Sequence, residues 1–107
     1  MTTRTLINMP RTARRGDVIE IRVTIGHPME TGYRPGMDGK RLARDIIQRF
    51  SCRYDGATVF AAELFPAISA NPYIAFHTVA TQSGTLEFCW EGDNGFSHTE
   101  SVALSVT

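Results

Sequence analysis

The amino-acid sequence predicts an all-β protein, an immunoglobulin-like antiparallel β-sandwich of about seven strands with a long loop at roughly residues 26–45. Three observations support this fold class. Apolar and polar residues alternate with the period of a half-buried strand, turn-forming residues recur between the alternating segments, and no convincing helical period is present. Strands that each bury one face pack naturally as two facing sheets, so the pattern favours a sandwich.

The N-terminal part of the chain predicts an edge strand at residues 3–8 and a stronger strand at 17–25, which follows a turn at Gly16-Asp17. The second strand has one almost entirely apolar face and one largely polar face. The apolar face comprises Ile19, Ile21, Val23 and Ile25, and the other comprises Val18, Glu20, Arg22 and Thr24. This alternation is typical of an antiparallel strand with one face in the core.

The segment after the long loop predicts a hairpin. In the strand at 46–54, one face comprises Ile46, Gln48, Phe50, Cys52 and Tyr54 and the other comprises Ile47, Arg49, Ser51 and Arg53. Phe50, Cys52 and Tyr54 are expected to face the core. Asp55-Gly56 is a turn signal, and residues 58–64 form the returning strand, which Pro66 ends.

The C-terminal part predicts strands at 73–81, 85–91 and 96–106, with turns at Ser83-Gly84 and at residues 92–95. In the middle strand, Leu86, Phe88 and Trp90 share one face, while Glu87 and Cys89 lie on the other.

Composition predicts a single soluble domain that spans residues 1–107, because a chain of this length with 42% hydrophobic residues can bury one core. The formal net charge is zero, and the local basic clusters are not interleaved with aromatic residues, so we expect no nucleic-acid partner. No apolar run approaches the roughly 18–20 residues that span a bilayer, so we expect no membrane insertion. The N-terminus lacks the apolar segment of a secretory signal, which by itself indicates the cytoplasm.

The residues that could carry chemistry form no recognisable catalytic set. Cys52 and Cys89 are either two buried small side chains or a disulfide between the sheets. His27, His77 and His98 are widely separated, and we expect ordinary strand or surface histidines rather than a shared metal site. Motifs for a catalytic nucleophile or a phosphate-binding loop are absent from the sequence. We therefore expect a protein that is not an enzyme and holds no metal or cofactor.

The long loop is polar, contains Pro and Gly, and is too long for a hairpin. Ordering it costs conformational entropy, and long ordered loops are frequent sites of recognition. Its candidate partner-binding residues are His27, Met29, Glu30, Tyr33 and Arg34. Met, Tyr and Arg are enriched at protein interfaces. The alternative is that Met29 and Tyr33 fold back onto the core and only anchor the loop.

A second candidate surface lies where apolar residues and prolines gather outside the predicted strands. Its candidate residues are Phe65, Pro66, Ile68, Pro72 and Tyr73. The alternative for this segment is a corner of the sandwich that packs on itself.

Short motifs distributed along the whole chain resemble the SoxZ family of the sulfur-oxidising (Sox) thiosulfate-oxidation system. In order, the matching residues are His27-Pro28-Met29-Glu30-Thr31-Gly32, Arg34, Asp38-Gly39, Ile46-Ile47, Arg49-Phe50, Pro66-Ala67, Asn71-Pro72-Tyr73 and Phe76. The chain length and the Gly/Asp-rich turn that follows Trp90 also match this family.

The resemblance implies a non-catalytic, immunoglobulin-like subunit that pairs with SoxY as a heterodimer. In this family the C-terminal Gly-Gly-Cys-Gly-Gly arm of SoxY holds the sulfur intermediate, and this chain ends without such an arm. The subunit is then expected to stabilise SoxY, to help dock the arm to other Sox enzymes in transient contacts, and to offer Arg34 and nearby basic groups to anionic intermediates. The resemblance also implies a periplasmic location, reached by export with a signal-bearing partner.

Two other possibilities follow from the same sequence. The chain could be a small metal- or thiol-dependent sulfur-binding redox protein that acts alone and uses Cys89, His77 and His98. In isolation, a subunit with an uncovered apolar partner face could also form a homodimer.

Overall fold

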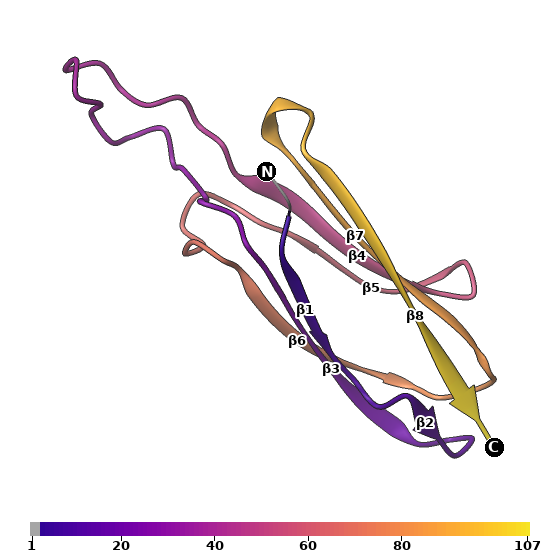
Figure 1. The fold of residues 1–107 in the computed structure, drawn as a ribbon. Coiled ribbons are helices and arrows are strands. Elements are labelled where there is room, and N and C mark those ends of the chain that lie inside the picture. The colour runs from indigo at the N-terminus through magenta and orange to yellow at the C-terminus, as the bar shows by residue number, and fades with distance from the viewer. Residues whose placement is uncertain (1–2) are drawn as a thin grey trace.

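Two β-sheets face each other in the computed structural model, which describes residues 3–107 (Figure 1). The strands are β1 (Thr5–Asn8), β2 (Thr12–Ala13), β3 (Val18–Ile25), β4 (Ile47–Tyr54), β5 (Ala57–Glu63), β6 (Tyr73–Val79), β7 (Gly84–Gly92) and β8 (Ser97–Val106). A single 3-10 turn, η1 (Asp93–Gly95), joins β7 to β8. The described residues contain no helix long and apolar enough to cross a membrane. The predicted all-β sandwich is confirmed.

The sheets have the strand orders β1-β3-β6 and β2-β8-β7-β4-β5. All pairs are antiparallel except β2 with β8, which is parallel and was not predicted. After β1, Met9-Pro10 interrupts the strand because proline has no N–H for a ladder, and the chain then reaches the other sheet. There the Ser105 N–H donates to the Arg11 carbonyl at 2.9 Å. A strand of two residues is too short to show a period in the sequence, so β2 could not be predicted.

The core lies between the sheets and is centred on Phe50. Its ring centroid lies 5.1 Å from that of Trp90 within the five-stranded sheet and 6.0 Å from that of Phe76 in the opposite sheet. The predicted apolar faces of β3 and β7 are buried as expected, and Phe50, Cys52 and Tyr54 also face inward. The aromatic side chains of β4 and β7 therefore join the two sheets.

The start of β4 departs from the predicted alternation. Ile46 and Ile47 are both buried, whereas Gln48 is exposed, although strict alternation places Gln48 on the same face as Phe50. The register between β4 and β7 shifts between Ile47 and Arg49, which indicates a β-bulge. Strict alternation cannot anticipate an inserted residue, because the period changes phase at that point.

The two long sides of the sandwich differ. On one side, the Thr5 hydroxyl of β1 donates a hydrogen bond to the Glu100 carboxylate of β8 and links the two sheets. On the other side, Phe60 of β5 stacks on Phe76 of β6 with centroids 4.5 Å apart. The first side is closed by a polar link, and the second by aromatic packing between two edge strands.

The long loop projects beyond one end of the sandwich (Figure 1). Isolated bridges pair Glu30 with Asp45 and Pro35 with Arg41, so the loop forms an irregular hairpin despite its length. The molecule is 58 Å long with a radius of gyration of 16.2 Å. A compact domain of about 100 residues has a radius of gyration of about 13 Å. The loop is thus a self-paired extension of the fold.

Replacing Phe50 with alanine is expected to lower the free energy of unfolding by about 3–5 kcal/mol, because the change opens a cavity among packed aromatic rings. Equilibrium urea denaturation followed by circular dichroism measures the loss. The control is Arg53→Ala, on the exposed face of the same strand, which should change stability by no more than about 0.5 kcal/mol. Equal losses in the two variants would contradict the central role of Phe50.

Candidate functional site

His27 holds the base of the long loop and is only 5% exposed to solvent. Its Nδ1 accepts a hydrogen bond from the Met29 N–H at 3.0 Å. Its Nε2 lies 3.6 Å from the carboxylate of Asp45, in the second half of the loop. Its backbone N–H donates to the Asn71 side chain at 3.1 Å, and its carbonyl accepts the Asn71 N–H at 2.8 Å. The His27 ring also contacts Phe96 edge-on at 5.0 Å.

Burial lowers the pKa of His27 below its ordinary value of 6.5, although the nearby carboxylates of Asp45 and Asp93 act in the opposite direction. A lowered pKa keeps the ring neutral near pH 7. A neutral ring is also what the hydrogen bond from Met29 requires, because only an unprotonated Nδ1 can accept it.

Met29 anchors the loop from the inside. It is 4% exposed, and its Sδ accepts the Ile47 N–H at 3.2 Å. Its φ of 48° lies in the left-handed region, which is an uncommon conformation for a residue other than glycine. The alternative of a loop anchored on the core therefore applies to Met29 but not to Tyr33, which is 70% exposed.

Asp93 of η1 ties the second run of the loop to the β7–β8 connection. Its carboxylate accepts two hydrogen bonds from Arg44, at 2.8 and 2.9 Å, one from the Ile46 N–H at 3.1 Å, and one from the Gln48 amide. The hydrogen bond from Arg44 is the main cause that lowers the pKa of Asp93. Gly92 beside it is required by space, since a Cβ there would lie 2.5 Å from the Ile46 carbonyl oxygen. Sequence reasoning treated this segment only as a turn, because its partners are distant in the chain.

The outer part of the loop carries the exposed candidates. Glu30 and Arg34 form an ion pair with a shortest distance of 2.5 Å, so the Arg34 guanidinium already has a carboxylate partner. Met37 is fully exposed, Tyr33 is largely exposed, and Leu42 is partly exposed nearby. Met37 was not among the sequence candidates, because its exposure depends on its place at the tip of the hairpin.

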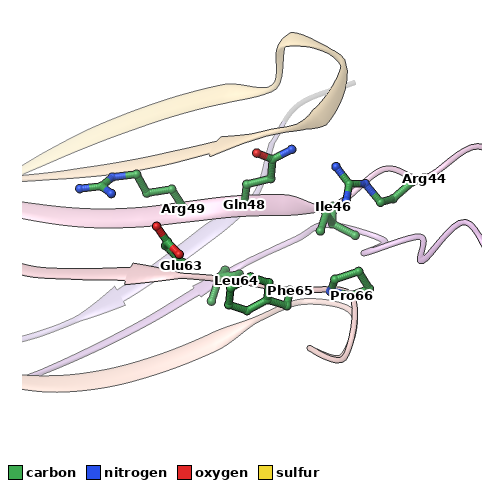
Figure 2. A pocket seen from close by; sticks show the side chains of 8 residues that line it. All are labelled: Arg44, Ile46, Gln48, Arg49, Glu63, Leu64, Phe65 and Pro66. Carbon is green, nitrogen blue, oxygen red and sulfur yellow. The ribbon is translucent and has the colours of Figure 1, made fainter.

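A pocket of about 380 Å³ opens where the loop meets β4 and the segment after β5 (Figure 2). Figure 2 shows Phe65 and Pro66 along one run of the chain, and Arg44 and Arg49 toward opposite ends of the neighbouring run. Arg49 lies opposite both Glu63 and Glu91 in the register of the sheet. The pocket thus combines an apolar wall with two arginines that each lie beside carboxylates, Arg44 beside Asp93 and Arg49 beside Glu63.

The second predicted surface is divided by burial. Phe65 and Tyr73 are 60% and 59% exposed, and Ile68 is also exposed, whereas Pro66 is half-buried and Pro72 is buried. The exposed members of this set lie between the pocket and the beginning of β6. Contact of any of these residues, or of the loop candidates, with a partner remains a prediction.

The cysteines and histidines do not converge. Both cysteines are free, so the disulfide alternative is wrong. The two thiols cannot bond because Cys52 points into the core, whereas Cys89 lies on the outer face of the same sheet. His77 of β6 lies near Glu20 of β3 in the three-stranded sheet, and His98 lies near Glu100 on β8. Within residues 3–107, no group of at least three His, Cys, Asp or Glu residues is placed to hold a metal ion.

The stability of the wild-type protein should fall between about pH 7.5 and pH 5.5 through the titration of His27. The folded pKa is lowered, so the unfolded chain binds the proton first, and stability is lost as the pH falls from the unfolded pKa to the folded one. His27→Asn keeps an acceptor near the Nδ1 position without titrating. Urea denaturation at both pH values should show a smaller decrease for this variant, and an equal decrease in both proteins would contradict the role of His27.

In the native protein, a thiol reagent should modify Cys89 well before Cys52. Burial raises the pKa of Cys52 to about 12, which leaves little reactive thiolate, and the side chain is enclosed. Labelling kinetics with Cys52→Ser and Cys89→Ser as the two single-thiol proteins measure the difference. Equal native rates for the two thiols would contradict the burial of Cys52, and both should react after unfolding.

Comparison with known proteins assigns the chain to a family. A family model described as sulphur oxidation protein SoxZ matches residues 7–103. A search of curated proteins gave no match.

Solved structures with the same fold include a superoxide reductase (neelaredoxin) from Ignicoccus hospitalis, which is 16% identical with a TM-score of 0.74 over 96% of this chain and 80% of that one. A putative superoxide reductase from Thermotoga maritima is 17% identical with a TM-score of 0.73 over 96% and 85% of the two chains. The sulfur carrier protein SoxY from Chlorobium limicola f. thiosulfatophilum is 13% identical with a TM-score of 0.68 over 96% and 78%. At such identities the likeness concerns the fold alone. The family model, in contrast, spans nearly the whole chain, and the protein therefore belongs to the SoxZ family of sulphur oxidation proteins.

Proposed function

We propose that this chain is the non-catalytic subunit of a sulfur-carrier complex in thiosulfate oxidation. It pairs with a SoxY-like protein, stabilises that protein, and helps present its cysteine-bearing arm to the other enzymes of the Sox system. Membership of the SoxZ family supports a role in this system. We further propose that the complex works in the periplasm and that this chain is exported together with a signal-bearing partner.

The observation that carries the proposal is the set of large apolar side chains left in solvent around the loop base and β6. Phe65, Ile68, Tyr73 and Val79 are all exposed although the core is well filled. Phe65, Ile68 and Tyr73 lie before and at the start of β6, and Val79 lies at its other end, so exposed apolar groups extend along this strand. Such groups favour association with another protein. The same residues gain burial when a partner covers them, which stabilises both chains.

The long loop supports the docking part of the proposal. It extends past the sandwich and is paired across its own base, so it can offer Tyr33 and Met37 to another protein without unfolding. Arg34 and Arg44 are exposed but have carboxylate partners, which leaves their charges partly compensated. Such pairs favour selective contacts with anionic groups over a strong general attraction.

Co-expression of this chain with the SoxY-like protein of the same genome is expected to yield a stable heterodimer. An affinity tag on the partner, followed by size-exclusion chromatography with light scattering at low and moderate salt, tests the association. The purified chain alone should not turn over thiosulfate. Failure to co-purify under both salt conditions would overturn the proposal.

The test of the surface uses Phe65→Ser with Ala103→Ser as the control, since both side chains are apolar and exposed. The first change should weaken the heterodimer about tenfold, because it removes an apolar anchor at the interface. The second change lies on β8, in the other sheet from β6, and should leave the affinity unchanged. Titration calorimetry measures both, and equal affinities would exclude Phe65 from the interface.

A further inference from the structure

β6 forms a sheet edge without the usual protection against strand pairing. It is the outer strand of the three-stranded sheet and pairs only with β3. Its sequence, from Tyr73 to Val79, contains no proline, lysine or carboxylate, and its register with β3 has no shift. Natural edge strands are commonly shortened, bulged or charged, because an open row of N–H and C=O groups recruits other strands.

The other sheet edges in the described part of the chain are short, shifted in register or charged. β8 pairs with β2 only at Ser105 and Val106, and the rest of this edge carries the Glu100 carboxylate. β2 has two residues and β1 has four, which is too short for extended pairing. β5 is longer, but its register with β4 shifts between Cys52 and Arg53, and the strand ends at Glu63. β6 therefore differs from each of them in combining length, regularity and lack of charge.

Alternate residues of β6 direct their backbone groups away from the sheet. The Ala80 N–H donates to the Asp17 carbonyl at 2.8 Å, and the Pro72 carbonyl accepts the Ile25 N–H at 3.3 Å. Because the register between these points is unshifted, the even-numbered residues bond to β3 and the odd-numbered ones face outward. The outward residues are Tyr73, Ala75, His77 and Val79.

The space beside this edge is open and partly apolar. A cavity of about 520 Å³ is lined by Val59 of β5 and Val79 of β6, together with polar residues that include Asp55 and Gln82. Phe60 of β5, which stacks on Phe76, is only half-buried. A strand added to β6 would cover these groups and satisfy the outward backbone row at the same time.

We propose that an edge strand of the SoxY-like partner pairs antiparallel with β6 and joins the two sandwiches through a continuous sheet, which rests on the proposed function. The SoxY structure has the same fold over 96% of this chain, so such a partner can offer the strand equivalent to β6. If the two edge strands are related by a pseudo-two-fold axis that passes through Phe76, then Ala75 lies opposite the partner residue equivalent to His77. The outward backbone groups of both strands then meet in register.

The test uses Ala75→Pro, which removes an outward N–H without removing a bond to β3 and puts the proline ring toward the approaching strand. The matched control is Ala61→Pro on β5. The Leu64 N–H donates to the Gln48 carbonyl at 2.8 Å, so by the same alternation the backbone of Ala61 also faces outward. Titration calorimetry with the SoxY-like protein of the same genome should show affinity reduced at least about tenfold for the first variant and little changed for the second.

Amide hydrogen exchange of the wild-type complex provides a second measurement that needs no variant. The amides of Ala75 and His77 should exchange rapidly in the isolated chain and at least about tenfold more slowly in the complex, while that of Ala61 stays unchanged. The complex could form while Ala75→Pro leaves the affinity unchanged and the β6 amides gain no protection. In that case the edge assignment is wrong and the proposed function stands. If the wild-type chain forms no complex, both are wrong. Protection of β6 in the chain alone that rises with its concentration would assign the edge to a second copy and overturn the partner assignment.

Discussion

The packing of Phe50 between the two sheets is the interaction on which the rest of the structure depends. Its ring meets Trp90 and Phe88 in its own sheet and Phe76 in the opposite one. Close-packed aromatic rings bury large apolar areas and fix the distance between the sheets. The positions of the edge strands follow from this frame, because β1 and β6 pair with β3, β5 pairs with β4, and β2 pairs with β8.

The long loop is ordered by polar groups drawn from distant parts of the chain. His27 joins the first run to the Asn71 segment, and Asp93 joins the second run to η1. Each group satisfies several donors or acceptors in a partly buried setting, where unpaired polar groups are costly. The result is an extension whose base is fixed and whose tip exposes Tyr33 and Met37, a suitable arrangement for recognition.

The two sides of the sandwich have different physical characters. Thr5 and Glu100 close one side through a polar link, whereas the other is closed by the packing of Phe60 on Phe76 and leaves the backbone edge of β6 unpaired. A chain that worked alone would gain from charge or a bulge on such an edge, because exposed strands aggregate. The asymmetry is consistent with a subunit whose fold is completed by a partner.

Periodicity alone predicted the sandwich and the buried faces of β3 and β7, since a period of two depends only on neighbouring residues. Motif order led to the SoxZ family. The sequence could not place β2 or the bulge at Gln48, because short pairings and phase shifts leave no repeating pattern. His27 and Met29 were selected from their residue types, but only the tertiary structure decided that they are anchors rather than exposed groups. The same holds for Asp93 and the open edge of β6, since burial and strand order arise from contacts between segments that the linear chain keeps far apart.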